Sequence, residues 1–497
     1  MADRTLSLPK KLFFGALVGT AVLWALNTAI EYMEAQRLLH TQTAIGTTSL
    51  LEESVFVRDG EEWTTSARVE NSMVRSRFPV QKAGKRVFIT GGSFAQGAPY
   101  TYPNQLQEGF GGIPSWLRED LKGHAPPVEV INVAAGGQDS RRVKAIVREL
   151  VEMEPDAIVV ASCNNESALQ PTTLQEQLHR FGTYRLLESL LRPTPTGGQA
   201  PAFYQPDSDE LREIDAAYES NLREMIEATG ERGVPLLLAT VPLQLRHGGY
   251  EAGSGRAWVP GTWSGDADVD VCIAEGRSLL ERGDARAAAL RLADCGSHPA
   301  ARETLEAAYM EVWRSGGTVQ DGDHPPGPCV ADLVQRFADG AYEQLLVDAA
   351  KCTEAPVDAL FWSGLAMAEL DRTDDAVRTL EQSAELQPQG RCRPSLNATV
   401  RRLAKEFGHV HLVDLDEAAR LASPRGIPGP ELFASNCHLR WSGYWLMSRV
   451  IGAQLQSLGL IERLRSESPA ALLQSARSRG LGEDPWARSV LETDVAP

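Results

Sequence analysis

Residues 85–97 read KRVFITGGSFAQG, a short apolar run that ends in two glycines and a serine. The run Arg86–Thr90 has the length and composition of a buried strand. Gly91 and Gly92 allow a tight turn directly after it, and this turn would present the Ser93 hydroxyl at the carboxyl end of the strand. Ligands of open α/β sheets bind at that edge, although a plain turn has the same composition.

Four further apolar segments have the same character. They lie at residues 128–133, 156–161, 235–241 and 409–415. Segments with helical periodicity occur between them, at residues 105–121, 141–153 and 208–229. Continuous apolar strands that alternate with helices are typical of a parallel sheet with helices on both faces. The sequence therefore predicts an α/β fold.

Two of these strands are followed by glycine and asparagine. Residues 132–140 read NVAAGGQDS, and residues 162–166 read SCNNE. In a parallel sheet both loops leave the same edge as Ser93. The backbone N–H of Gly137 and the side-chain amide of Asn165 are suitable donors for a developing oxyanion, although both residue types are also common in turns.

A histidine follows the last predicted strand. Residues 433–444 read FASNCHLRWSGY and precede an apolar helical segment. An isolated histidine usually has a structural role. His438, however, comes just before the final helix of a sheet whose first loop carries Ser93, so it is a candidate general base.

Together these four segments resemble the SGNH (GDSL-like) hydrolase superfamily. The resemblance covers residues 85–241 and 392–458, in the same order, and is strongest to the membrane-anchored bacterial branch with tetratricopeptide repeats. It implies a three-layer, flavodoxin-like hydrolase domain that needs no metal and no cofactor.

The resemblance also implies the catalytic roles. Ser93 would be the nucleophile, and His438 would be the general base that accepts its proton. The oxyanion hole would consist of the Ser93 amide, Gly137 and Asn165.

Three positions depart from the family pattern. Gly92 stands where most members have aspartate, a change that this branch shares, and Cys163 replaces a glycine. Ser435 replaces the aspartate that orients the histidine, a group whose loss costs a serine protease about 10⁴ in rate. A Ser–His dyad and a degenerate site both stay open, and the nearby Asp414 and Glu431 cannot be placed from the sequence.

Residues 267–388 are rich in Ala, Leu, Arg and Glu and show no strand pattern. Within them the segments Cys272–Cys295 and Cys329–Cys352 have the same length, and glycine follows the first cysteine at the same interval, at Gly283 and Gly340. This repeat predicts two helical hairpins. Each cysteine pair could form a disulfide across its hairpin, or the thiols could be unrelated and buried.

A third block, residues 357–388, resembles a tetratricopeptide repeat. The matching residues are Trp362, Gly364, Ala376, Leu380 and Pro388. The sequence therefore predicts an all-α, tetratricopeptide-like insert that interrupts the α/β domain and could bind a protein partner.

Three cysteines lie outside the repeat. Cys392–Cys437 and Cys163–Cys437 are both conceivable pairs, and a Cys437 nucleophile is disfavoured because this residue is adjacent to His438. His409 and His411 share one face of a strand, but no carboxylate or cysteine cluster accompanies them as a metal site would require.

The N-terminal region contains an uncharged run at residues 12–30. As a helix it would be about 28 Å long, close to the thickness of a bilayer core. The flanking charges are Arg4, Lys10 and Lys11 before the run, and Glu31 and Glu34 after it. This asymmetry predicts a single-pass anchor with a cytoplasmic N-terminus and a periplasmic or extracellular bulk. A cleaved signal peptide is the alternative, but the sequence shows no good cleavage site.

The chain has 497 residues and a formal net charge of −17, from 49 basic and 66 acidic side chains. This acidic balance argues against a nucleic-acid partner, since neutralisation of phosphates dominates such binding. Residues 91–97 also contain neither the lysine of a phosphate-binding loop nor the glycine spacing of a dinucleotide site.

The predicted organisation follows from these patterns. It comprises a cytoplasmic segment (1–11), the anchor (12–30), a connector that begins with a short helix and is then irregular and polar (31–84), the first part of the hydrolase domain (85–262), the helical insert (267–388), the second part of the hydrolase domain (390–460) and a tail (461–497). The resemblance implies an esterase or O-acyl (acetyl) transferase acting on a small acyl ester, such as one on a cell-envelope glycan. The alternative is a degenerate domain that serves envelope assembly as an interaction scaffold.

Overall fold

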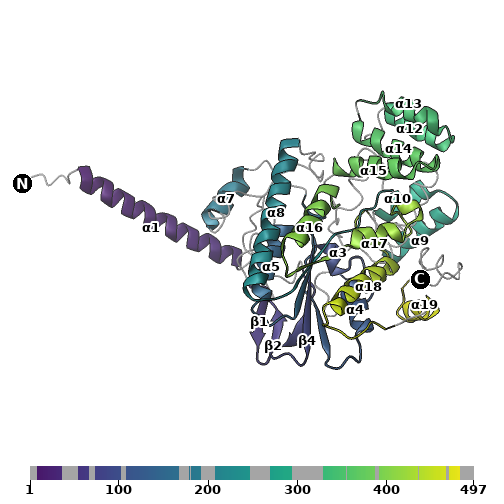
Figure 1. Ribbon diagram of the computed structural model, residues 1–497. Coiled ribbons are helices and arrows are strands. Elements are labelled where there is room, and N and C mark those ends of the chain that lie inside the picture. Colours follow the sequence, from purple (N-terminus) through teal and green to yellow (C-terminus); the bar gives the residue numbers. More distant parts are fainter. Residues whose placement is uncertain are drawn as a thin grey trace, which may run out of the picture. The chain divides into compact units, whose positions relative to one another are not determined.

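A five-stranded parallel sheet forms the centre of the computed structural model (Figure 1). Its strands, in chain order, are β4 (Lys85–Gly91), β5 (Val128–Asn132), β6 (Ala157–Ala161), β7 (Leu236–Ala239) and β8 (Val410–Val413). They lie side by side in the order β5-β4-β6-β7-β8. All five strands expected from the sequence are present, and the α/β fold with a parallel sheet is confirmed.

The structure describes a defined part of the chain. The described residues are 8–35, 54–66, 73–101, 108–166, 178, 181–191, 208–246, 269–293, 328–353, 355–386, 391–434, 436–465 and 469–481. The chain divides into two compact units, one formed by residues 1–53 and 169–204 and the other by residues 54–168 and 205–497. The sheet belongs to the second unit.

Helices lie on both faces of the sheet. On one face α5 (Ser140–Leu150) packs beside α8 (Ser208–Glu231), and α8 packs beside α16 (Pro394–Glu406). On the other face α4 (Ile113–Asp120) packs beside α18 (Trp441–Ser457). Residues of β6 are buried along its whole length, which explains why this strand is apolar without alternation.

The helix predicted at residues 105–121 begins later than expected. Residues 102–107 lie outside the described residues, and α4 begins only at Ile113. Gly111 has a φ of +133°, a left-handed conformation, and Gly112 is extended at the N-cap. These glycines interrupt the helix, and Pro114 in the first turn favours a start there.

The strand order contains one topological switch point. Numbered within the sheet, the order is 2-1-3-4-5, the flavodoxin-like arrangement. The chain leaves β4 toward β5 on one side and later returns to β6 on the other. Ligands of such sheets bind where the order reverses, at the carboxyl ends of β4 and β6.

A small antiparallel sheet lies in the region that the sequence reading treated as an irregular connector. Its strands are β1 (Phe56–Asp59), β2 (Glu62–Thr65) and β3 (Arg77–Pro79). The prediction of an irregular segment was wrong here. A tight turn at Gly60, with φ +62°, joins β1 to β2. Phe78 packs edge-on against both Phe56 and Phe88, at centroid distances of 5.1 and 5.6 Å, and so fastens the small sheet to β4.

Helical hairpins occur in the predicted insert, between β7 and α16. The described helices are α9 (Val269–Glu281), α10 (Ala285–Ala293), α12 (Pro328–Ala338), α13 (Tyr342–Ala349), α14 (Pro356–Glu369) and α15 (Thr373–Glu385). Gly283 and Gly340 occupy equivalent turns, with φ of +80° and +69°. The predicted pairing of helices within this region is therefore confirmed.

The hairpins share one packing register. A Cβ on Gly276 would meet the Leu292 side chain, and a Cβ on Gly364 would meet that of Leu380. The same register positions in the middle hairpin hold Leu333 and Ala349, both buried. The large and small members are thus exchanged between the middle hairpin and the other two.

One of the two predicted hairpin disulfides is present. Cys329 and Cys352 are bonded, with their Cα atoms 5.8 Å apart. The side chain of Cys272 and all of Cys295 lie outside the described residues. The hairpin core also includes Leu243 and Ile427, which belong to loops beside the parallel sheet.

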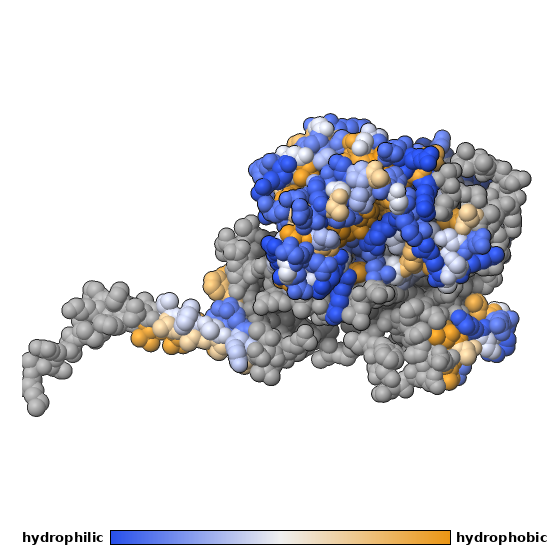
Figure 2. Space-filling model, turned by 90° about the horizontal axis from the view of Figure 1, so that it is seen from below, coloured by the Kyte–Doolittle hydropathy of each residue, from blue (hydrophilic) through white to orange (hydrophobic). Residues whose placement is uncertain are grey.

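The first unit contains α1 (Leu8–Ala35) and α7 (Gly182–Leu191). The Thr183 amide donates a hydrogen bond of 3.2 Å to Asn27 Oδ1. Figure 2 shows apolar side chains on the surface of α1, where Leu23 and Trp24 are 62% and 71% exposed. Within the part of the chain that the structure describes, we find no helix that combines the length and apolarity of a membrane span. The side chains of residues 12–17, at the start of the predicted anchor (12–30), lie outside the described part of the chain.

Candidate active site

Ser93 and His438 meet at the carboxyl edge of the sheet. The Nε2 atom of His438 lies 2.9 Å from the Ser93 hydroxyl, although the two residues are 345 positions apart. Ser93 is the first residue of α3 (Ser93–Gln96), directly after β4. His438 is 8% exposed. This contact joins the predicted nucleophile to the predicted base.

Gly91 makes the turn before Ser93 possible. Its φ is +147°, and a Cβ there would lie 1.9 Å from the Ala161 carbonyl oxygen of the neighbouring strand. Only glycine allows this approach between the ends of β4 and β6. The sequence GGS therefore fixes the place where the hydroxyl leaves the sheet.

Two tyrosines hold the histidine segment against the serine segment. The Tyr100 hydroxyl accepts a 2.9 Å hydrogen bond from the Trp441 amide, and the Tyr444 hydroxyl donates one of 2.6 Å to the Ala98 carbonyl. The N-terminal end of α18 is thus bonded to the loop after α3. The backbone of His438 is further fixed because its carbonyl accepts from the Ala434 amide at 2.9 Å.

The two predicted oxyanion residues lie beside this pair. The Asn165 Nδ2 atom donates to the Gln138 carbonyl at 2.9 Å, so the loop after β6 is bonded to the loop after β5. A Cβ on Gly92 would be only 2.6 Å from that same Nδ2 atom. Gly137, with φ +70°, has open space where a side chain would begin. Three loops therefore converge around Ser93.

Glu166 supports this arrangement, a role that the sequence reading did not assign. It is 2% exposed, and its carboxylate accepts hydrogen bonds from the Ser140 amide and, at 3.1 Å, from the Ser140 hydroxyl. Asn221 donates to the same hydroxyl at 3.0 Å. Burial raises the pKa of Tyr218, and the Glu166 charge adds to the rise. Glu166 so fixes the start of α5 and the Gly137 turn before it.

Two carboxylates near His438 in the sequence have other partners. Asp414 accepts hydrogen bonds from Arg401 at 2.8 Å and Thr240 at 2.9 Å. Burial is the largest influence on the pKa of Asp414 and raises it, but the hydrogen bond and charge of Arg401 and the hydrogen bonds from the Glu417 amide and Thr240 together lower the pKa below its ordinary value. Glu431 pairs with Arg246. Both carboxylates are thus held in ion pairs, and Ser435 lies outside the described residues.

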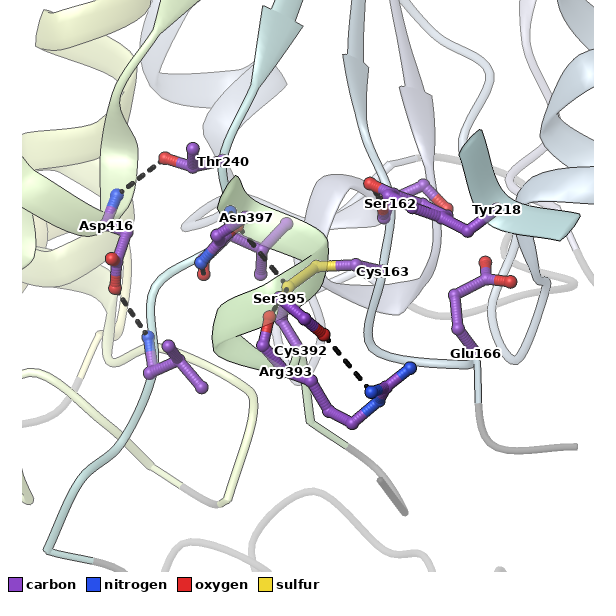
Figure 3. The surroundings of a disulfide bond; sticks show 12 residues. Ser162, Cys163, Glu166, Tyr218, Thr240, Cys392, Arg393, Ser395, Asn397 and Asp416 are labelled. Carbon is purple, nitrogen blue, oxygen red and sulfur yellow. Dashed lines mark hydrogen bonds between the residues drawn. A yellow bond between two sulfur atoms is a disulfide. The ribbon is translucent and has the colours of Figure 1, made fainter. Parts of the chain in front are cut away.

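The disulfide beside the site differs from both pairings considered above. Cys163 is bonded to Cys392, with Cα atoms 4.9 Å apart (Figure 3). The reason lies in α16, whose Asn397 side chain accepts from the Val241 amide at 2.9 Å and donates to its carbonyl at 2.8 Å. This docking brings Cys392 to the end of β6. The Cys437 sulfur instead lies 3.8 Å from both ring nitrogens of His438.

The two histidines considered as metal ligands are His411, in β8, and His409, directly before it. His409 Nε2 lies 2.9 Å from the Ile226 carbonyl oxygen. Burial lowers the pKa of His411, and the neighbouring His409 lowers it further. Across the described ranges, no cluster of three or more histidine, cysteine or acidic side chains could hold a metal ion.

No protein-family model matches the chain, and no curated protein matches its sequence. A hydroxyl in contact with an imidazole can form an acyl-enzyme, and an adjacent glycine turn and asparagine amide can stabilise the tetrahedral oxyanion that precedes it.

Proposed function

We propose that the protein is an SGNH-type serine esterase or O-acyltransferase that acts on small acyl esters. The 2.9 Å contact between Ser93 Oγ and His438 Nε2 carries this proposal. Nucleophile and base within hydrogen-bond reach are the signature of covalent acyl transfer. Their position at the switch point of the sheet, where ligands bind, supports it further.

In the proposed reaction His438 accepts the Ser93 proton while the serine oxygen attacks the acyl carbonyl carbon. The oxyanion that forms is held by the amides of Ser93 and Gly137 and by Asn165. One Asn165 amide hydrogen is bonded to the Gln138 carbonyl, which leaves the second for the oxyanion. His438 then returns the proton to the leaving alcohol, and water or another hydroxyl releases the acyl group from Ser93.

The location and partners belong to the same proposal. An uncharged run at residues 12–30 after basic residues supports an anchor with the sheet domain outside the cytoplasm, where acylated envelope glycans would be the substrates. The tetratricopeptide-like hairpins support a protein partner, since stacked helical repeats provide extended binding surfaces. If this scaffold role were the whole function, Ser93 would have no covalent chemistry.

A fluorophosphonate probe tests the proposed function directly. Such a probe reacts with activated serines, so we expect a single adduct on the peptide that contains Ser93, located by mass spectrometry. The His438→Gln variant should be labelled at least about 100-fold more slowly, because the hydroxyl loses its base. Heat-denatured protein is the control. Labelling that is equal in native and denatured protein, or that avoids Ser93, would contradict an acyl-transfer site.

The contact between Gly92 and Asn165 gives a second prediction. The Gly92→Ala substitution places a methyl group 2.6 Å from Asn165 Nδ2. We expect kcat/KM for p-nitrophenyl acetate to fall about 10- to 100-fold, because a displaced oxyanion donor loses most of its effect. In an Asn165→Ala background the same change should cost less than about twofold, since the clash is gone.

Gly408→Ala is the matched control for this cycle. Gly408 has ordinary φ and open space around it, so its variant should keep wild-type activity. Equal losses from Gly92→Ala with and without Asn165 would show that the methyl group acts elsewhere.

A further inference from the structure

Buried arginines in this protein are paired with acidic groups at two well-defined places. Arg86, on β4, is fully buried, and its Nε atom lies 2.8 Å from Glu129. Arg393, just before α16, is 1% exposed and bonds Glu385 at 2.7 Å as well as Asp215. Such pairing is the rule, because an unpaired buried charge is destabilising.

Arg391, two residues before Arg393, differs. It is 6% exposed. Among the residues that the structure describes, no carboxylate forms an ion pair with its guanidinium, and no carbonyl or hydroxyl accepts a hydrogen bond from it. Burial lowers the pKa of Arg391 to about 10, while the nearby Cys437 acts in the opposite direction. The side chain stays a cation at neutral pH, and none of the described carboxylates is paired with it.

Two connections place Arg391 beside the catalytic pair. The residue that follows it, Cys392, is bonded to Cys163, two positions before Asn165. Its electrostatic neighbour Cys437 is the residue before His438, with its sulfur 3.8 Å from the ring nitrogens. Arg391 is thus linked to the oxyanion loop through the disulfide and to the base through Cys437.

A second unsatisfied polar group is next in sequence to the other cysteine of the disulfide, Cys163. Asn164, between Cys163 and Asn165, is 4% exposed. Within the described part of the chain neither its Nδ2 nor its Oδ1 atom has a hydrogen-bond partner. Buried amides nearly always have partners, so this amide is available to a ligand. A buried guanidinium and a buried amide are therefore each adjacent in sequence to one cysteine of this disulfide.

We propose that Arg391 and Asn164 bind an anionic group of the substrate, a carboxylate or a phosphate, next to the acyl ester that Ser93 attacks. The planar guanidinium matches both anions with two parallel hydrogen bonds, and a desolvated site strengthens them. This deepens and rests on the proposed esterase function: the substrate class becomes an acylated acidic sugar or phosphate-bearing glycan rather than a neutral one.

Calorimetric titration of the full chain with glucuronate, glucose 6-phosphate and glucose tests the proposal without requiring turnover. We expect glucuronate, glucose 6-phosphate or both to bind the wild-type protein at least tenfold more tightly than glucose. The anion that binds more tightly shows whether the site recognises a carboxylate or a phosphate. Arg391→Gln should lower the affinity for that anion at least tenfold, and Asn164→Ala should lower it several-fold. The control Arg212→Gln, at an exposed position, should bind the anion with wild-type affinity. Glucose binding equal to that of both anions, or Arg391→Gln binding within twofold of wild type, would overturn the proposal.

Thermal unfolding separates a ligand site from a structural role. A buried cation without an acidic partner destabilises the folded protein, so Arg391→Gln should not lower the midpoint of thermal unfolding in the absence of ligand. Arg393→Gln should lower this midpoint, because it breaks a buried ion pair. A large drop for Arg391→Gln would count against the proposal. Ser93→Ala should keep anion binding, so a failure of catalysis and a failure of anion recognition give different results.

Discussion

Replacing Ser93 with alanine will lower kcat for p-nitrophenyl acetate by about 10³-fold or more. The reason is that the variant lacks the oxygen that the His438 imidazole contacts at 2.9 Å and that would carry the acyl group. His438→Ala should cost a similar factor. Because the two residues act as one unit, the double variant should be no slower than either single variant. Steady-state rates of p-nitrophenol release measure all three.

Ser457→Ala is the matched control, since this serine is exposed at the far end of α18. It removes the same hydroxyl without touching the site and should leave the rate unchanged. Equal rates for wild type and Ser93→Ala would refute serine catalysis. Additive losses in the double variant would mean that serine and histidine act in separate steps.

The strands of the sheet could be predicted because their signal is local. A strand covered on both faces must be apolar along its length, as in the buried residues of β6, and no distant contact is needed to recognise it. The glycine turn at Gly91 is also local, since a left-handed φ excludes other residues there. For the same reason the serine segment was recognisable before any coordinates.

The features that could not be predicted from the sequence depend on contacts between segments that are far apart in the chain. The Cys163–Cys392 bond spans 229 positions and follows from the placement of α16 by Asn397 beside β7. Three cysteines of unknown position allow three pairings, and none has a distinguishing local pattern. The β1–β2 hairpin is a different case, because its two-residue loop, Gly60-Glu61, is a local turn signal, but the strands on either side alternate only weakly.

The site divides in the same way. Ser93 and His438 were identifiable as residue types in characteristic loops, yet their contact needed the fold. The role of Glu166 follows from its bond to the Ser140 amide, and that of Arg391 from the absence of any acidic partner among the described residues. Both are properties of surroundings rather than of local sequence. Buried polar side chains that lack partners among the described residues therefore indicate functional positions that the local sequence does not reveal.

Removal of the Cys163–Cys392 disulfide should have the largest effect on stability. The bond closes a loop of 229 positions, for which the chain-entropy model gives a loss of roughly 5 kcal/mol in the free energy of unfolding. We expect the Cys163→Ala/Cys392→Ala variant to lose several kcal/mol in urea unfolding. Its esterase rate should also fall, because Cys163 is two positions before Asn165 and the freed loop would no longer hold the oxyanion donor in place.

The Cys329→Ala/Cys352→Ala variant is the matched comparison, because it also removes one disulfide. Its loop spans only 23 positions, so the same model gives roughly 3 kcal/mol, confined to the helical hairpins. Its esterase rate should stay within about twofold of wild type. A rate that falls equally in both variants would show that activity follows stability in general. A rate that falls only without Cys163–Cys392 would show that this bond positions the oxyanion loop, since the helical insert can then be loosened without consequence at Ser93.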